Sequence, residues 1–564
     1  MKIPVRPAAR PAFEFPGSIR QSQSRSKGRR TRGPTIRPPS GASAASVRFT
    51  QTELSLATHS RSQGIFRSRP KGGRAVVALL LATGAATVAL AQDAAFDPDA
   101  EIVIGSLYEP QNLDNTAGAG QGINEAFNGN VYEGLFRLTD AGAVEPLLAA
   151  NTAVSEDGLT YTFTLQPGVT FHSGDPLTAA DVKYSIERVT AETSQSSRRS
   201  SLAGITDIRV IDDLTVEVDL AQRSIALPYN LSYVWIVNDA AGDITAAEDG
   251  TGPYQLAEWR RGSALALDRF DGYWGEAPTN GSVVFTYFTD ASALNNALLT
   301  GAIDIIPSVQ SPDSLALFAG NPDFTVTEGQ STTKLVLAYN DRVAPFDNAD
   351  VRRAIARAID NAALLRAVWG DYGTLIGSFV PPTDPWYVDL TDVNAYDPAS
   401  ARELLAAAGY PDGFTFTLDT PNYDPHPLAA QFIQAALAEI GVTAEINIIT
   451  ANEWYTRIYQ QQDFEATLQE HVNHRDIVFY GNPNFYWGYD NPEVTRLLQE
   501  GDAAATEAER DELFRQANVI IAEDAASDWL YLYPQIVVSS SSVSGFPING
   551  LNSQFYAYGI EKAD

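Results

Sequence analysis

The sequence predicts an α/β fold, because strand-like and helix-like hydrophobic patterns alternate along it. Four segments carry apolar residues at every second position, the spacing of half-buried strands: 161–165, 215–220, 264–268 and 414–418. The last of these is followed by an apolar helical segment, 428–440, and then by a further strand-like segment, 442–449. Strand, helix, strand in this order is typical of a crossover unit in an α/β sheet.

Helices with recognisable ends lie between the strands. Ser400-Ala-Arg-Glu403 has the spacing of a capping box and precedes a helix expected to close at Gly409. Thr506-Glu-Ala-Glu509 has the same spacing and opens a second helix with one apolar stripe. Apolar residues at helical spacing over 351–359 predict a third.

Composition and charge exclude several classes of protein. The 564 residues include no cysteine, so disulfide bonds, thiol nucleophiles and thiolate metal ligands are excluded. Residues 1–91 contain 16 Lys and Arg against two acidic residues, which leaves 23 basic and 67 acidic residues in 92–564. That part therefore has a formal net charge of −44, and no nucleic-acid partner is expected because a phosphate backbone would be repelled. No segment after residue 91 approaches the roughly 20 continuous apolar residues of a membrane-spanning helix.

The first 91 residues divide into a basic extension and an apolar segment. Residues 1–73 are rich in Arg, Ser, Pro and Gly, which predicts a disordered extension or a gene start assigned too far upstream. Residues 74–91 are apolar and end in Ala89-Leu-Ala91, which predicts a secretory signal peptide cleaved after Ala91. Because no cysteine is present to carry a lipid, we expect the mature protein to be free in a periplasm.

Motifs of catalytic and metal sites are largely missing from the sequence. It has no Gly-x-Ser-x-Gly elbow, no His-Glu-x-x-His motif and no phosphate-binding Gly-rich loop with Lys. His471 and His474 have a spacing that suits a metal on one helical face, but Arg475 would place a cation beside the second ligand. Asn473 and Asp476 favour a polar loop there instead. The sequence therefore predicts no enzyme, no cofactor and no resident metal.

A series of ordered motifs carries a family resemblance. Its densest part is Asn130-Val-Tyr-Glu-Gly-Leu-Phe-Arg137, Val144-Glu-Pro-Leu-Leu148, Ser155-Glu-Asp-Gly-Leu-Thr-Tyr-Thr-Phe-Thr-Leu165 and Gly168-Val-Thr-Phe-His-Ser-Gly-Asp-Pro-Leu-Thr-Ala-Ala-Asp-Val182. Later matches include Gly250-Thr-Gly-Pro-Tyr254, Asp271-Gly-Tyr-Trp-Gly275, Leu298-Leu-Thr-Gly-Ala-Ile-Asp304 and Asn491-Pro-Glu-Val494. Together they resemble the signature of the family-5 bacterial extracellular solute-binding proteins, the peptide and nickel class of ABC importers. The resemblance covers essentially all of residues 101–550.

The resemblance implies a two-lobed periplasmic binding protein (type II, cluster C-like) with an extra subdomain inserted in the first lobe. The expected parts are lobe I at 92–131, 250–330 and 540–564, the inserted subdomain at 132–249, and lobe II at 331–539. Two crossing segments would join the lobes, which close on a ligand and so shift from open to closed. A membrane permease would recognise the closed form, and we expect a monomer.

Ligand contacts are expected from loops that face the cleft between the lobes. The resemblance places such loops after the first strand, at the start of the second lobe and in its middle. The expected ligand-binding residues are Tyr108, Glu109, Asn112, Tyr339, Asn340, Trp386, Tyr387, Tyr423, His471, His474, Arg475, Asp476, Phe485 and Trp487. The aromatic members offer flat faces beside polar groups, although each is equally compatible with core packing.

One segment departs from the family pattern. Peptide-binding relatives commonly have a Trp followed three residues later by an Asp that captures the ligand's α-ammonium group, and here these positions fall on His471 and His474. A histidine does not replace a carboxylate as partner of an ammonium group, whereas His474 and Arg475 suit a carboxylate or phosphate. If the loop 469–476 is shifted by one or two residues, Glu470 or Asp476 restores the acid.

The sequence thus predicts a periplasmic substrate-binding subunit of an ABC transporter that captures a peptide or related small polar solute. Two alternatives stay open: binding of a nickel-type metal chelate through His471 or His474, and a secreted enzyme with carboxylates in a cleft. The negative charge also favours cationic solutes at long range, although salt screens it beyond about 8–10 Å.

Overall fold

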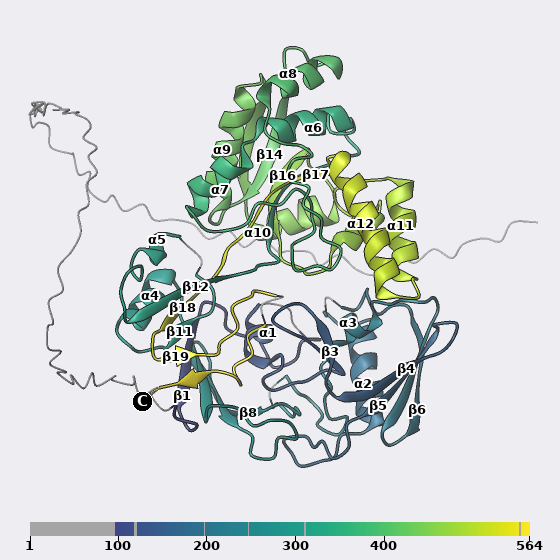
Figure 1. The fold of residues 1–564 in the computed structure, drawn as a ribbon, viewed down its shortest axis with the longest axis vertical. Coiled ribbons are helices and arrows are strands. Elements are labelled where there is room, and N and C mark those ends of the chain that lie inside the picture. Colours follow the sequence, from purple (N-terminus) through teal and green to yellow (C-terminus); the bar gives the residue numbers. More distant parts are fainter. Residues whose placement is uncertain are drawn as a thin grey trace, which may run out of the picture. The chain divides into compact units, whose positions relative to one another are not determined.

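The computed structural model describes residues 96–117, 121–196, 198–245, 247–309, 312–551 and 554–563. The predicted basic extension 1–73 and the predicted signal peptide 74–91 lie outside these residues. Two large sheets and one smaller sheet organise the described part, with helices packed against them (Figure 1).

Seven strands form the first large sheet, in the order β12-β18-β11-β1-β10-β9-β8. β1 runs parallel to its neighbours β10 and β11, and the other pairs are antiparallel. The strands are β1 (Glu101–Ser106), β8 (Tyr254–Arg260), β9 (Ala264–Arg269), β10 (Ser282–Tyr287), β11 (Ile305–Ile306), β12 (Phe324–Gly329) and β18 (Gln535–Ser540). This part also contains α1 (Gln121–Phe127), α4 (Ala291–Leu299), α5 (Pro312–Leu315), β19 (Val543–Ser544) and β20 (Glu561–Lys562).

The smaller sheet has four antiparallel strands in the order β4-β5-β7-β6 and lies within the predicted inserted subdomain. In β5 and β7 buried and half-buried residues alternate, which confirms the period-two prediction. The elements are β2 (Phe136–Leu138), β3 (Val144–Pro146), β4 (Ala149–Val154), β5 (Thr160–Leu165), α2 (Ala179–Thr190), β6 (Ile205–Asp212), β7 (Thr215–Leu220) and α3 (Leu227–Leu231).

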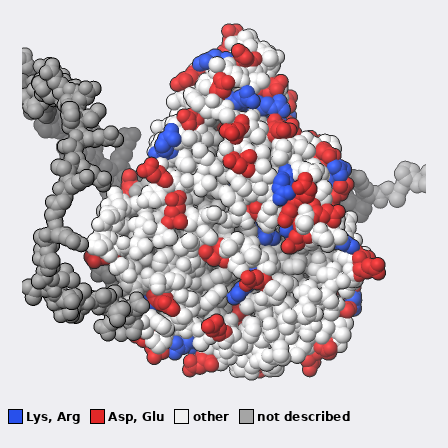
Figure 2. Space-filling view, viewed as in Figure 1, with Lys and Arg blue, Asp and Glu red and all other residues white. Residues whose placement is uncertain are grey.

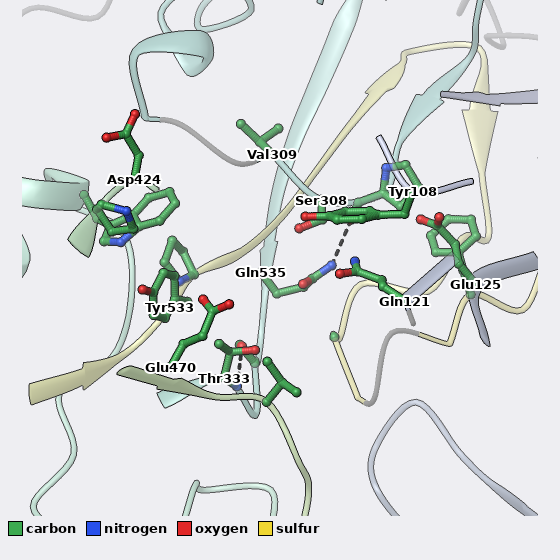
Figure 3. A pocket seen from close by; sticks show the side chains of 18 of the residues that line it. Tyr108, Gln121, Glu125, Ser308, Val309, Thr333, Asp424, Glu470, Tyr533 and Gln535 are labelled. Atoms are coloured by element: carbon green, nitrogen blue, oxygen red, sulfur yellow. Dashed lines mark hydrogen bonds between the residues drawn. The ribbon is translucent and has the colours of Figure 1, made fainter. Parts of the chain in front are cut away.

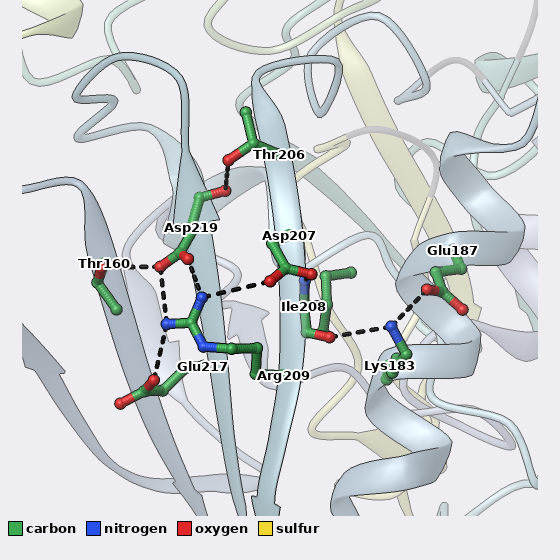
Figure 4. Close-up of polar contacts among 9 residues, drawn as sticks. All are labelled: Thr160, Lys183, Glu187, Thr206, Asp207, Ile208, Arg209, Glu217 and Asp219. Carbon is green, nitrogen blue, oxygen red and sulfur yellow. Dashed lines mark hydrogen bonds and ion pairs between the residues drawn. The ribbon is translucent and has the colours of Figure 1, made fainter.

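A charged cluster on this sheet joins two adjacent strands. Arg209 of β6 reaches across to β7, where its guanidinium contacts Glu217 at 2.8 Å and also pairs with Asp219 (Figure 4). The Asp219 carboxylate in turn accepts a hydrogen bond from Thr160 of β5, at 2.8 Å. Opposite charges facing one another across strands stabilise a sheet, each pair by roughly 0.2–1 kcal/mol.

The second large sheet has five strands in the order β15-β14-β16-β13-β17. Its strand β13, between β16 and β17, is buried throughout: Leu335, Leu337 and Tyr339 face one hydrophobic core, and Val336 and Ala338 face another. The strands are β13 (Lys334–Tyr339), β14 (Thr415–Pro421), β15 (Thr443–Ile449), β16 (Ala466–His471) and β17 (Ser527–Leu532).

Helices supply the other side of both cores. The first core takes side chains from α6, α7, α8 and α9, and the second from α11, α12 and the segments around 376–390 and 477–489. The helices are α6 (Ala349–Ala358), α7 (Asn361–Trp369), α8 (Pro398–Ala407), α9 (His426–Ala438), α10 (Ala451–Glu453), a π-helix (Trp454–Gln460), a 3₁₀ helix (Ile477–Gly481), α11 (Pro492–Asp502) and α12 (Glu507–Glu523). β14, α9 and parallel β15 confirm the predicted crossover unit.

The predicted helix starts are confirmed in one case and wrong in another. Thr506 caps α12, because its side chain accepts a hydrogen bond from the backbone N–H of Glu509. The capping box predicted at Ser400 is wrong: α8 begins two residues earlier, and Asp397 caps it by accepting from the N–H groups of Ala399 and Ser400. A cap followed by Pro at the first helical position is itself a strong start signal, and Asp397-Pro398 fits it better than Ser400.

Two short segments connect the large sheets. Residues 330–333 lead from β12 to β13, and residues 533–534 lead from β17 back to β18. Because β18 pairs with β12 and β11, residues 535–540 belong to the first sheet, although the predicted return to lobe I was at 540. β17 and β18 are both largely buried and are separated by Tyr533-Pro534 alone, so the local pattern does not mark the change of sheet.

The described residues include no helix long and apolar enough to cross a membrane. On the face shown in Figure 2, acidic side chains are scattered among uncharged ones, and most basic side chains stand beside acidic neighbours. No cluster of basic side chains gathers on that face of the described part, as expected from the charge of residues 92–564.

Candidate ligand-binding site

A cavity of about 360 Å³ lies where the two large sheets are joined. Both crossing segments contribute to its wall, through Ser331 and Thr333 on one side and Tyr533, Pro534 and Gln535 on the other. Figure 3 shows this cavity, with side chains from both sheets directed towards it. A ligand held there contacts both lobes and the segments that join them.

The loop after β1 supplies the first-lobe side of the cavity. Ser106, the last residue of β1, accepts a hydrogen bond from the backbone N–H of Tyr108 at 3.0 Å and donates one to Glu125 Oε2 at 2.6 Å. Tyr108 and Glu125 both line the cavity. Burial raises the pKa of Tyr108 to about 12, and the carboxylates of Glu470 and Glu125 add to the shift, so the phenol stays neutral.

The second lobe contributes Glu470 from β16 and Tyr423 from the loop after β14. Side chains alternate along a strand, so Glu470 points to the opposite side of the sheet from Gln469 and His471. In Figure 3 its carboxylate points into the space between Tyr533, Thr333 and Gln535. The Tyr423 hydroxyl donates a hydrogen bond to Glu470 Oε1 at 3.4 Å.

Burial raises the pKa of two carboxylates that line this cavity, Glu125 and Glu470. The pKa of Glu125 is raised to about 7 by burial, against the lowering effect of the hydrogen bond from Ser106. The pKa of Glu470 is also raised by burial, and the Tyr423 hydroxyl lowers it only in part. Perturbed acids that converge on a cavity are typical of functional sites.

A second cavity of about 440 Å³ lies between the inserted subdomain and the second lobe. Four of the predicted site residues line it: Trp386, His474, Arg475 and Asp476. Tyr229 of the inserted subdomain faces them, and its hydroxyl donates to the His474 backbone oxygen at 2.9 Å. Of the other predicted residues, Tyr108 and Tyr423 line the first cavity.

The polar groups of the 473–476 segment are engaged within the protein. His474 Nε2 lies 2.8 Å from Asp384 Oδ1, and Arg475 donates to the Gly142 oxygen at 3.0 Å. Asp476 Oδ1 lies 2.7 Å from the Nζ of Lys334, a pair that is almost completely buried. Burial raises the pKa of Asp476 to about 7 although Lys334 opposes the shift.

The predicted loop 469–476 is a strand over its first three residues, because β16 continues through His471. His471 is buried, and its Nε2 lies 2.9 Å from the hydroxyl of Tyr486. Burial, with a contribution from Lys334, lowers the pKa of His471 to about 3, so its ring is neutral. Among the described residues, no group of three or more His, Asp or Glu is arranged to hold a metal ion.

The remaining predicted residues lie outside the linings of both cavities. The Glu109 carboxylate accepts hydrogen bonds from the Trp259 indole and the Gly262 backbone, and Asn112 accepts one from the Asp114 backbone. The others pack in or against the second-lobe cores or bond to neighbouring loops: Tyr339, Asn340, Tyr387, Phe485 and Trp487. Whether these residues contact a ligand stays a prediction.

Several lining residues were not among the predicted contacts, notably Gln121, Glu125, Thr333, Tyr533 and Gln535. Glu125 had a local signal: it is a single carboxylate in α1 that is 5% exposed, between Ile123 and Phe127. A buried charged residue on an apolar helix is unusual enough to suggest function. The crossing segments carried no such signal, because only the sheet pairing places them beside the cavity.

Comparison with known proteins decides the family. The family model named "Bacterial extracellular solute-binding proteins, family 5 Middle" matches residues 143–473. The glutathione-binding protein GsiB of Salmonella paratyphi A is 32% identical over 396 residues, which cover 66% of this chain and 74% of that protein. The chain belongs to the family-5 bacterial extracellular solute-binding proteins. It is therefore an ABC transporter substrate-binding protein of a non-enzymatic family, which confirms the predicted class over a secreted enzyme.

Solved structures confirm the predicted α/β periplasmic-binding-protein fold. AgaA from A. tumefaciens R10, in complex with agropinic acid, is 26% identical with a TM-score of 0.70, covering 82% of this chain and 99% of that chain. CtaP from Listeria monocytogenes is 21% identical with a TM-score of 0.74, covering 83% of this chain and all of that chain.

Proposed function

We propose that this family-5 protein is a periplasmic subunit that captures a peptide or related small polar solute in the cavity between its two large sheets. The observation that supports this is the lining, because both lobes and both crossing segments meet around one space of about 360 Å³. Small-molecule sites typically have volumes of about 300–1,000 Å³, so this cavity suits a solute at the small end of that range.

The position of the cavity explains how ligand binding would change the conformation that a permease recognises. Tyr108 of the first lobe and Tyr423 of the second face the same space, so a ligand that contacts both stabilises the closed arrangement. The segments 330–333 and 533–534 are short enough to act as hinges. A ligand shifts the open and closed populations by its differential affinity for them, and a permease that recognises the closed form then receives loaded protein.

The relatives support a solute of this general kind. GsiB is named as a glutathione-binding protein, and DppA from Helicobacter pylori was solved in complex with the peptide STSA. The metal-chelate alternative has less support here, because the ring nitrogens of His471 and His474 that it would use contact Tyr486 and Asp384.

Native mass spectrometry of the purified protein tests this function. We expect a small molecule to be retained and released on denaturation, and Thr333→Trp, which fills the cavity, to abolish retention. Thr325→Trp is the matched control, because Thr325 is exposed on β12 outside the lining. Equal retention by Thr333→Trp and the unaltered protein would show that the ligand lies elsewhere.

The proposed location has its own test. If residues 74–91 are a cleaved signal peptide, protein recovered from the periplasm of a secreting host begins at Gln92. N-terminal sequencing measures this directly, and a chain that keeps residues 1–91 would contradict it.

A further inference from the structure

The charges around the cavity between the sheets are all of one sign. Among the described residues, its lining contains three carboxylates, Glu125, Asp424 and Glu470, and no Lys, Arg or His. Residues 118–120, 310–311 and 552–553, which border lining segments in the sequence, are Gly, Ala, Gln, Ser or Asn and add no cation. A solute that enters this cavity therefore meets negative charge without a compensating positive side chain.

Some carboxylates buried elsewhere in the described residues have cationic partners, whereas others, such as Glu133 and Asp528, have only uncharged side-chain partners. Asp476 pairs with Lys334 at 2.7 Å, Asp114 with Arg188 at 2.7 Å, and Asp304 with Lys562 at 2.8 Å. Glu125 and Glu470 belong to the second group, because the side-chain partners of their carboxylates are the hydroxyls of Ser106 and Tyr423. Unlike Glu133 and Asp528, both of them line the cavity. A carboxylate that is shielded from water without a cation costs free energy, so a cation that a ligand places beside either of these two lowers that cost.

The other lining side chains suit the same kind of group. Tyr108, Trp369, Tyr423, Tyr533 and Phe555 surround the space with aromatic rings, whose faces attract cations by roughly 0.5–2 kcal/mol each. The buried Tyr533 hydroxyl has no hydrogen-bond partner among the described residues and is available to a ligand. Glu470 points from β16 into the middle of this space, whereas Asp424 is exposed at its rim (Figure 3).

We propose that the cavity takes a cationic organic amine or guanidine that has no free carboxylate, with Glu470 as its principal partner and Glu125 as the deeper one. This inference rests on the proposed function, since it assigns a substrate class to the same cavity. A carboxylate on the solute would face the two glutamates in a site of low dielectric, where like charges repel strongly. Glutathione carries two carboxylates, so we expect it to bind poorly although a relative is named for it.

Two pairs of small molecules test how a carboxylate on the solute affects binding. Cadaverine is lysine without its carboxylate, and agmatine is arginine without its carboxylate. Isothermal titration of the ligand-stripped full chain is expected to give at least tenfold tighter binding of each decarboxylated amine than of its parent amino acid. Glutathione and trialanine serve as the anionic and zwitterionic comparisons, and both are expected to bind more weakly than the amines.

Two variants test whether the preference for decarboxylated amines arises in the cavity. Glu470→Gln keeps the shape of the side chain but removes its charge, so we expect cadaverine and agmatine to bind at least tenfold more weakly. Glu445→Gln removes the same charge from an exposed position on β15, outside the lining, and is expected to change binding less than twofold. Equal effects of the two variants would show that long-range charge, rather than the cavity, sets the preference.

The outcomes separate this inference from the function on which it rests. Tighter binding of lysine, arginine, trialanine or glutathione than of the amines overturns the inference. If Thr333→Trp abolishes that binding, the proposed function still stands. No binding by any of these solutes overturns the inference, and it contradicts the proposed function only if native mass spectrometry also finds no retained molecule.

Discussion

Loss of the buried ammonium of Lys334 is predicted to destabilise the protein strongly. Its Nζ lies 2.7 Å from Asp476 Oδ1, 2.9 Å from the Asn473 oxygen and 4.3 Å from the Phe379 ring centroid. The side chains of Lys334 and Asp476 are 0% and 3% exposed. Removing one partner of a buried ion pair costs about 3–5 kcal/mol, because the other charge is left unpaired in a low-dielectric interior. We therefore expect Lys334→Met to lower the free energy of unfolding by that amount.

Urea unfolding at pH 8 and pH 5 measures both the size and the cause of this loss. Burial already raises the pKa of Asp476 to about 7, and without Lys334 the pKa rises further. At pH 5 the carboxyl of the folded variant is then protonated and the unpaired charge disappears, so the loss at pH 5 is smaller than at pH 8. Lys334→Met combined with Asp476→Asn removes both charges and is expected to recover most of the stability at pH 8.

An exposed ion pair provides the control. Lys183 and Glu187 are 2.6 Å apart, with side chains 37% and 53% exposed, so Lys183→Met is expected to cost less than about 1 kcal/mol. If Lys334→Met costs no more than this control, or its cost does not depend on pH, the argument from burial is refuted.

Four further outcomes follow from single positions. Between pH 4.5 and about 7 the folded protein keeps a proton on Glu125 that the unfolded chain has released, so the free energy of unfolding falls as the pH rises. Glu125→Gln should remove up to about 3 kcal/mol of this fall, as measured by urea unfolding across this pH range. Asp397→Ala should cost about 1 kcal/mol by thermal unfolding, whereas Ser400→Ala should cost little if Asp397 caps α8. Gly413→Ala should destabilise strongly, since its Cβ would lie 1.9 Å from the Gly441 oxygen. Gly409→Ala should cost only about 1 kcal/mol for its positive φ, since its Cβ meets nothing.

Local patterns predicted the elements well where one face of an element is buried. The alternation in 161–165 and 215–220 reflects strands with one face on a core, and the β14-α9-β15 order reflects a crossover helix covering its own strands. The start of α8 was misplaced because Asp397 and Ser400 both match cap preferences, and only the hydrogen bonds distinguish them.

Long-range pairing was beyond the reach of these patterns. β18 joins the first sheet by pairing with β12, which lies more than 200 residues earlier in the sequence. The residues of 535–540 carry no pattern that predicts this pairing. The cavity is assembled by the same pairing, because it brings Gln535 beside Thr333 and the loop after β1. With 67 carboxylates after residue 91, no sequence pattern separated Glu470 from acids that only face solvent, and Glu125 stood out only as a single acid between Ile123 and Phe127.

The partners of the 471–476 side chains and the acidity of the cavity between the sheets can be understood together. His471 contacts Tyr486 and His474 contacts Asp384, so both side chains serve the second lobe itself. Asp476 is likewise committed to Lys334. Glu470, one residue before His471 on β16, faces the cavity and has no cationic partner. We infer that charge selection in this cavity depends on Glu470, because the strand fixes its carboxylate and a solute must bring the positive charge to it.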